Sequence, residues 1–111
     1  MSNSILLDKS NELALEVIRL CHEIKTNKKE SILTNQLVRS RTSVGANIRE
    51  AFYAHGKTDF IARLHNALKE CAESEYWLVL LTEGGYTDNK VVLYFCGANT
   101  EKMHLRKQVL F

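Results

Sequence analysis

The sequence predicts an all-α fold, specifically an up-down-up-down antiparallel four-helix bundle. The chain has 111 residues, no proline and only five glycines, whereas an all-β chain needs many turns. Four long segments repeat apolar residues at helical spacing, and short polar stretches separate them. Because no segment can bury its apolar side alone, and short connections make neighbours antiparallel, one domain spanning residues 1–111 is expected.

The first two segments have clear apolar stripes. Residues 4–25 form the first segment, and the polar stretch TNKKE ends it; residues 31–54 form the second. The stripe of the first segment consists of Leu6, Leu13, Val17, Leu20, Cys21 and Ile24. The stripe of the second consists of Leu33, Leu37, Val44, Ile48 and Ala51.

Glycines mark the limits of the other two segments. We expect Gly56 to end the second helix and Thr58 to cap the third, which covers residues 59–83. The stretch GGYTD then precedes a fourth helix at residues 88–110. The third stripe consists of Phe60, Leu64, Ala67, Leu68, Cys71, Leu78 and Leu81. The fourth, less regular, consists of Val91, Val92, Phe95, Ala98, Leu105 and Val109.

The stretch LVRSRTSVGANIREAF, residues 37–52, allows two interpretations. A helix-turn-helix would bend the chain sharply near RSRTS and reset the helical phase. The stripe of the second segment instead keeps one phase throughout, and RSRTS contains no glycine. We therefore predict one continuous helix, and a DNA-binding helix-turn-helix regulator built on residues 33–52 is the alternative.

The second helix also carries a polar motif beside its stripe. A helical wheel places Ser40 and Asn47 inside the stripe, and Gln36, Ser43, Arg39 and Glu50 along one flank. We expect three other side chains of this helix to point toward solvent, namely Arg41, Thr42 and Arg49.

The third helix has matching polar residues on its apolar side. Glu75 lies between Cys71 and Leu78, and Ser74 is beside it. A buried carboxylate needs a partner, and we predict Arg39, whose planar fork binds carboxylates in a bidentate manner. The alternative is that Ser40 or Asn47 holds Glu75. The expected role of these groups is structural, and we expect no catalytic, cofactor or metal site.

These polar residues carry a family resemblance. The pattern Q..RS..S...NI.E begins at Gln36, and F...L..A......SE begins at Phe60 and ends at Ser74 and Glu75. Over residues 33–81 the chain resembles bacterial four-helix-bundle proteins first noticed as reading frames in intervening sequences of large-subunit ribosomal RNA genes. The resemblance implies a homopentamer without established catalytic activity. Accessory proteins of diversity-generating retroelements, which bind a reverse transcriptase and RNA, are more distantly similar.

Two features depart from the family pattern. Ala51 stands where the family usually has glycine, and the segment after Gly85 matches poorly. We therefore expect the packing of the fourth helix to be atypical.

Composition excludes several function classes. The chain has no apolar run long enough for a membrane span, and its start resembles no export signal, so a cytoplasmic protein is expected. Cys21, Cys71 and Cys96 have no metal-binding spacing and are expected to be reduced, buried thiols. A di-metal enzyme needs two Glu-x-x-His motifs, and we find one, at Glu101 to His104.

The leading functional hypothesis is therefore a non-enzymatic oligomeric scaffold or adaptor. Its expected partners are itself and RNA or an RNA-bound protein, without a cofactor or small-molecule substrate. A net charge of +2 is weak, but five subunits would carry +10 around a ring. If nucleic acid binds, the expected contacts are Lys28, Lys29, Arg106 and Lys107.

Overall fold

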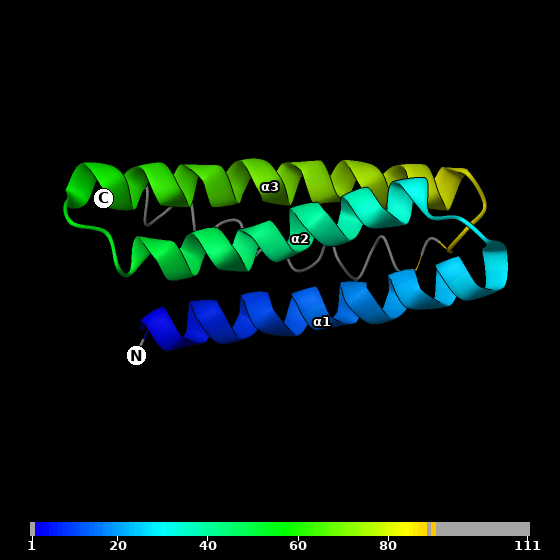
Figure 1. Ribbon diagram of the computed structural model, residues 1–111, viewed down its shortest axis with the longest axis horizontal. Helices are drawn as coiled ribbons and strands as arrows, with labels where there is room; N and C mark the ends of the chain where they lie inside the picture. The colour runs from blue at the N-terminus through cyan, green and yellow to red at the C-terminus, as the bar shows by residue number, and fades with distance from the viewer. Residues whose placement is uncertain (1, 89, 91–111) are drawn as a thin grey trace.

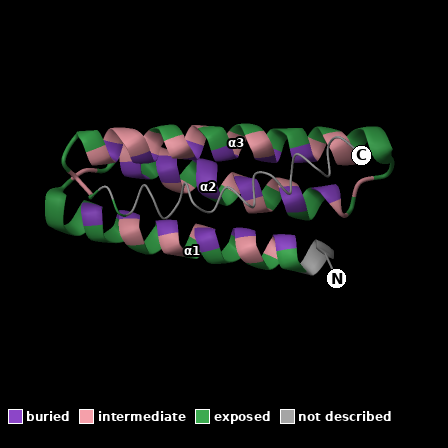
Figure 2. Cartoon of the chain, turned by 180° about the vertical axis from the view of Figure 1, so that it is seen from behind, coloured by how far each residue is buried: buried purple, intermediate pink, exposed green. Residues whose placement is uncertain are grey.

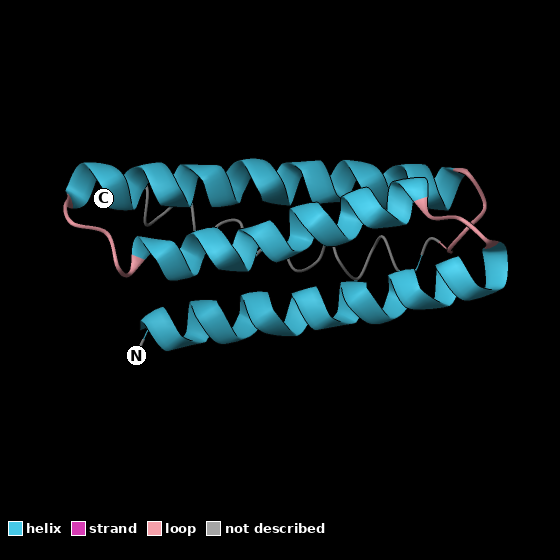
Figure 3. Ribbon diagram, viewed as in Figure 1, coloured by secondary structure: helices cyan, strands magenta, loops and turns pink. Residues whose placement is uncertain are grey.

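The computed structural model describes residues 2–88 and 90, and the side chains of these residues from Ile5 onward. Three helices are present in this part of the chain: α1 (Ser2–Lys28), α2 (Ile32–Ala51) and α3 (Lys57–Glu83), joined by short turns (Figures 1 and 3). The prediction of an all-α fold is confirmed for these residues. The predicted fourth helix, at residues 88–110, falls almost entirely outside them.

The three helices run up, down and up, and α2 packs against both of its neighbours (Figure 1). Consequently α1 begins at the same end of the molecule as the turn between α2 and α3. The turn between α1 and α2 lies at the opposite end, beside the end of α3.

Buried residues recur along α1, α2 and α3 (Figure 2), and the apolar ones form two clusters. The first cluster contains Leu6, Val44, Ile48, Ala51, Leu64, Ala67 and Cys71. The second contains Leu13, Val17, Cys21, Ile24, Leu37, Leu78 and Leu81. All fourteen belong to the predicted stripes, while Leu20, Leu33, Phe60 and Leu68 are partly buried against them.

Polar residues separate the two clusters along every described helix. On α1, Ser10 lies between Leu6 and Leu13. On α2, Ser40 and Arg41 lie between the clusters, and on α3 the corresponding residue is Ser74. All four are buried, so the described core is apolar toward both ends and polar in between.

The region of the proposed helix-turn-helix is one helix. Residues 32–51 are helical without a break, so the alternative of a helix-turn-helix at residues 33–52 is wrong. An unbroken helix advances by about 100° per residue, so Leu37, Val44 and Ile48 lie on one face of α2, and all three are buried.

The connection between α1 and α2 is shaped by local hydrogen bonds. Lys29 adopts a left-handed conformation with φ of 58°, which ends α1. The Glu30 carboxylate then accepts the backbone N–H groups of Leu33 and Thr34, at 2.8 and 2.9 Å. This bond pair satisfies amide groups that the start of α2 would otherwise leave without a helical partner.

The turn between α2 and α3 differs from the prediction in detail. α2 ends at Ala51 rather than at residue 54, and residues 52–54 continue with turn hydrogen bonds to residues 49–51. Gly56 does not stop α2 but precedes α3 in an extended conformation. Thr58, which we expected as the cap, lies inside the first turn of α3.

Candidate interaction surface

The polar motif of α2 is largely satisfied by the helix itself. Ser40 Oγ donates to the carbonyl of Leu37 at 3.2 Å. Ser43 Oγ donates to Arg39 at 2.8 Å, and Asn47 Nδ2 donates to Ser43, also at 2.8 Å. Side chains that bond back to the preceding turn can lie in a helix interface without an external partner. These side chains therefore satisfy part of their hydrogen-bonding capacity within α2.

Arg39 forms the centre of a charged network between α2 and α3. Its Nη1 atom lies 3.4 Å from Glu70 Oε1, and its Nη2 atom contacts Glu73 Oε1. Its Nε atom donates to Gln36 Oε1 at 3.1 Å on the same helix. Glu73 Oε1 also accepts the indole N–H of Trp77 at 3.1 Å. One guanidinium thus ties one turn of α2 to two turns of α3.

The predicted pair between Arg39 and Glu75 is wrong. Arg39 contacts Glu70 and Glu73 instead, because these residues lie on the flank of α3 that faces α2. Glu75 is partly buried on the other flank of the same apolar stripe. The alternative holders are also wrong, since Ser40 and Asn47 donate to backbone carbonyls of α2.

A second charged group continues this flank toward the α2–α3 turn. Arg63 Nη1 lies 2.9 Å from Glu50 Oε2, and Arg63 Nε lies 3.7 Å from Asp59 Oδ1. Together with the Arg39 network, these pairs occupy the polar flank of α2 with residues of α3. The polar flank of α2 is therefore used within the chain.

Arg41 is the clearest error of the wheel analysis. It was expected to face solvent but is only 5% exposed. Its Nη1 atom donates to Ser74 Oγ at 3.2 Å, and Ser74 Oγ donates in turn to the carbonyl of Cys71 at 2.8 Å. Thr42 and Arg49 are exposed, as expected. Ser74 is itself buried, so the buried guanidinium of Arg41 and the buried hydroxyl of Ser74 join α2 to α3.

Two groups of apolar side chains lie outside the core. On α1, Leu15 and Ile18 are one turn apart and exposed, and we call them the α1 patch. On α3, Tyr76 is exposed, and its ring centroid lies 5.2 Å from that of the partly buried Trp77. On α2, Ile32 is exposed as well.

Ile32 and the two aromatic residues lie toward the same end of the bundle. Ile32 precedes Arg39 by seven residues, so the two share a face of α2 two turns apart. Tyr76 and Trp77 follow Glu73, the partner of Arg39, by three and four residues. Because α2 and α3 are antiparallel, Ile32 lies toward the same end of the bundle as this pair. We call Ile32, Tyr76 and Trp77 the α2–α3 patch.

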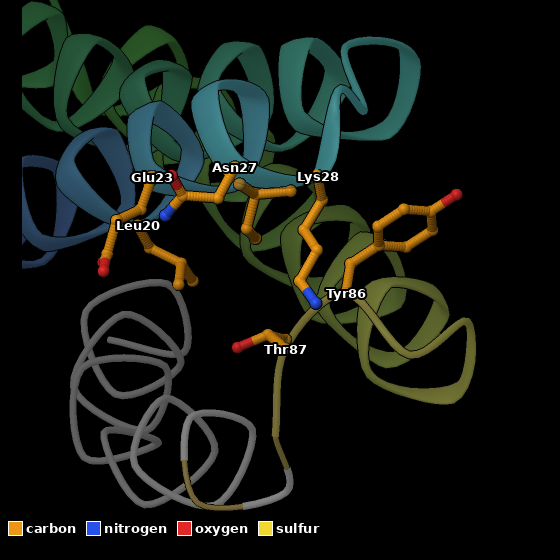
Figure 4. Close-up of a pocket in the computed structure, with 7 residues that line it drawn as sticks. Leu20, Glu23, Asn27, Lys28, Tyr86 and Thr87 are labelled. Atoms are coloured by element: carbon orange, nitrogen blue, oxygen red, sulfur yellow. The ribbon is translucent and has the colours of Figure 1, made fainter.

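The predicted nucleic-acid contacts lie at the end of the bundle where α1 joins α2. Lys28 and Lys29 are exposed there, whereas Arg106 and Lys107 fall outside the described residues. A pocket at this end is lined by Leu20, Glu23, Ile24, Asn27, Lys28, Tyr86 and Thr87. Figure 4 shows Lys28 extending toward the segment of Tyr86 and Thr87. Figure 4 shows Glu23 at the opposite side of this pocket from Lys28.

The two described cysteines are buried free thiols, as expected. Burial raises the pKa of Cys21 to about 11, and nearby Lys25 only partly opposes this shift. Cys96, Glu101 and His104 fall outside the described residues. Across residues 2–88, together with Lys90, no group of three or more His, Cys, Asp or Glu side chains could hold a metal ion. Within this same part of the chain, no helix is long and apolar enough to cross a membrane.

Comparisons with known proteins extend the resemblance to nearly the whole chain. The sequence model of the 23S rRNA-intervening sequence protein family matches residues 2–108, which includes most of the segment expected to depart from the pattern. The structure is similar to that of a protein of unknown function from the S23 ribosomal protein family of Bacteroides thetaiotaomicron. The sequences are 36% identical, the match covers 99% of this chain and 96% of that one, and the TM-score is 0.86. Comparison with curated proteins gave no match.

Proposed function

The chain belongs to the 23S rRNA-intervening sequence protein family, and on this basis we propose a non-enzymatic scaffold that assembles with itself. In this proposal residues 88–110 complete a four-helix bundle, and five copies form a ring. The ring presents repeated surfaces to RNA or to an RNA-bound protein. The family match and the two apolar patches support the proposal, and the self-bonded polar motif of α2 is consistent with the absence of catalysis.

The observation that carries the proposal is that the α1 patch and the α2–α3 patch are separate. A contiguous exposed apolar patch is typical of an interaction site. A two-fold dimer needs one self-complementary patch, whereas a ring needs two different patches that meet head to tail. Leu15 and Ile18 on one helix, and Tyr76 with Trp77 on another, meet this requirement.

Light scattering on purified protein at micromolar concentration tests the assembly. We expect a mass near five times the 12.7 kDa of one chain. Ile18→Glu and Tyr76→Glu should each give monomers, because a carboxylate cannot be buried in an apolar interface without a partner. Ala62→Glu, an exposed position of α3 about 14 residues and thus ~21 Å from Tyr76, is the control and should leave the mass unchanged.

Mixing the two monomeric variants tests the head-to-tail arrangement. Each variant retains the patch that the other has lost. In a ring built from two different patches, the mixture should form a dimer of one Ile18→Glu chain and one Tyr76→Glu chain. A monomeric parent protein, or a mixture that stays monomeric, would contradict the proposed arrangement.

A further inference from the structure

The turn between α2 and α3 exposes an aromatic ring among cationic residues. Tyr53 is 79% exposed, which is the largest exposure among the large apolar and aromatic side chains of the described residues. Arg49, His55 and Lys57 are exposed within four residues of it along the chain. By contrast Phe52, the neighbour of Tyr53, packs against the core and lies 6.3 Å from Phe60 between ring centroids. The turn is thus anchored by Phe52 and presents Tyr53 outward.

The two acidic residues near this turn share one cation, and the five charged side chains from Arg49 to Arg63 sum to +1. Glu50 and Asp59 both contact the guanidinium of Arg63. Within the described part of the chain, neither Arg49 nor Lys57 forms an ion pair. The two free cations therefore remain available to an anionic partner.

The start of α3 adds to the positive potential of the turn. Gly56 supplies no side-chain cap, so the first amide groups of α3 point out at Lys57 and beyond. The helix dipole places partial positive charge at this same end. This contribution reinforces the two free cations but would not define a site without them and the exposed ring.

Among the described residues, the opposite end of the bundle shows no such combination of an exposed aromatic ring and unpaired cations. There, Lys25 donates to Asn35, and the Glu30 carboxylate is occupied at the start of α2. The aromatic residue at that end, Tyr86, is partly buried against the second apolar cluster. The α2–α3 turn is therefore better suited to a planar, negatively charged polymer than the predicted surface at Lys28 and Lys29.

We propose that the α2–α3 turn binds single-stranded nucleic acid, with Tyr53 stacked on a base and with Arg49 and Lys57 on the flanking phosphates. Stacking requires an unpaired base, and every base offers a face to an aromatic ring, so recognition is independent of sequence. The phosphates of the strand would provide anionic partners for Arg49 and Lys57. The inference rests on the RNA contact in the proposed function and assigns it to a surface and a class of ligand.

Fluorescence anisotropy at low salt tests the inference. The probes are a labelled oligouridine of about 12 nucleotides, a length within the usual range of single-strand sites, the matching oligothymidine, and an RNA duplex of the same length. Both single strands should bind more tightly than the duplex, and the tighter of the two identifies the natural class. Tyr53→Ala should weaken binding by about tenfold or more, while Tyr53→Phe should retain it.

The cations are tested by salt dependence. Arg49→Gln and Lys57→Gln should each lower the slope of log affinity against log salt by about 0.7 for a single strand. The matched control is the pair Lys28→Gln and Lys29→Gln, which removes two cations from the opposite end and should leave binding unchanged. Because the substituted side chains are exposed, circular dichroism should show a fully helical protein in every variant.

Each of the following results would overturn the inference. These are equal binding by Tyr53→Ala and the parent protein, loss of binding in the control pair, or duplex binding as tight as that of the single strands. A protein that binds a partner protein but none of the three probes would also overturn it. Light scattering on the same samples separates the two proposals, since a ring without binding contradicts this inference alone, and a monomer contradicts the assembly.

Discussion

Arg39 and Arg41 lie two residues apart on α2 in opposite surroundings. The Arg39 side chain is 48% exposed and pairs with two carboxylates of α3. Arg41 is 5% exposed and donates to Ser74 between two apolar clusters. The comparison shows that residue type did not decide which arginine became buried. The phase of each residue relative to the apolar stripe did.

That phase was visible in the sequence. Leu37, Arg41, Val44 and Ile48 step by four, three and four residues, which is the spacing of one helix face. Arg39 is displaced from this face toward α3. The expectation that Arg41 points toward solvent was wrong, because its spacing from Leu37, Val44 and Ile48 matches the stripe.

The strongest test of the comparison is removal of the buried arginine. Arg41→Ala should lower the free energy of unfolding by about 2–5 kcal/mol, because it empties a large buried volume. Arg41→Met should cost less, since it keeps much of the volume and removes a charge that is costly to bury. Urea denaturation measures both. If Arg41→Ala lowered the free energy of unfolding no more than Arg39→Ala does, the two arginines would not differ in the way proposed.

A carboxylate at the start of the same helix is an intermediate case. Burial alone would raise the pKa of Glu30, but hydrogen bonds from Leu33 and Thr34 outweigh it, and the pKa falls below its ordinary value of 4.5. Glu30→Ala should therefore cost about 1 kcal/mol at neutral pH, as expected for a lost helix cap.

The pH dependence of this effect follows from the direction of the shift. A lowered pKa in the folded state means that the stabilisation is complete above pH 4.5 and is lost as the pH falls through the folded value. Denaturation of parent and Glu30→Ala protein at several pH values should show their difference shrinking below pH 4.5. A difference that stays constant down to pH 3 would contradict this account of the cap.

The exposed arginine should contribute less. We expect Arg39→Ala and Glu73→Ala each to lower stability by no more than about 1 kcal/mol, because exposed ion pairs are largely offset by solvation. A double-mutant cycle should detect weak coupling between Arg39 and Glu73. The same cycle between Arg39 and Glu75 should detect no coupling. Measurable coupling would indicate that Arg39 pairs with Glu75, as the sequence had predicted, and not with Glu73.

The smallest effect is expected on the outer face of α2. Thr42 is exposed, and its Oγ1 donates to the carbonyls of Val38 and Arg39 within the helix. Thr42→Ala should raise stability by a few tenths of a kcal/mol, up to ~0.7 kcal/mol, because alanine favours the helix more. A loss of more than about 1 kcal/mol would indicate that this face is also buried, as in an oligomer interface.

Much of the described fold could be predicted from apolar spacing. The stripes of α1, α2 and α3 supply both clusters, and the unbroken phase from Leu33 to Ala51 excluded a turn. Helix ends were less predictable because they depend on local bonds. The Glu30 carboxylate caps α2, for example, although Ser31 is the residue that precedes it.

The partner of Arg39 could not be predicted for a different reason. Glu73 and Glu75 lie on opposite flanks of one stripe on α3, and periodicity treats both flanks alike. Which flank faces α2 depends on the direction in which the bundle turns, and a single sequence does not encode this in its spacing. The exposed Tyr53 was missed because its exposure depends on where α2 ends and how Phe52 anchors the turn.

The polar residues between the two clusters also restrict how the helices can align. Apolar stripes alone would allow α3 to slide along α2 by one turn, since leucine packs against leucine in several registers. Such a slip would move the Arg41 guanidinium from Ser74 toward Cys71 or Leu78. A hydrogen bond to a charged group contributes about 1.5–3 kcal/mol, so the slipped alignments, which lose the bond between Arg41 and Ser74, are less stable than the native one. Arg41 and Ser74 thus select one alignment from several that would bury equal apolar area.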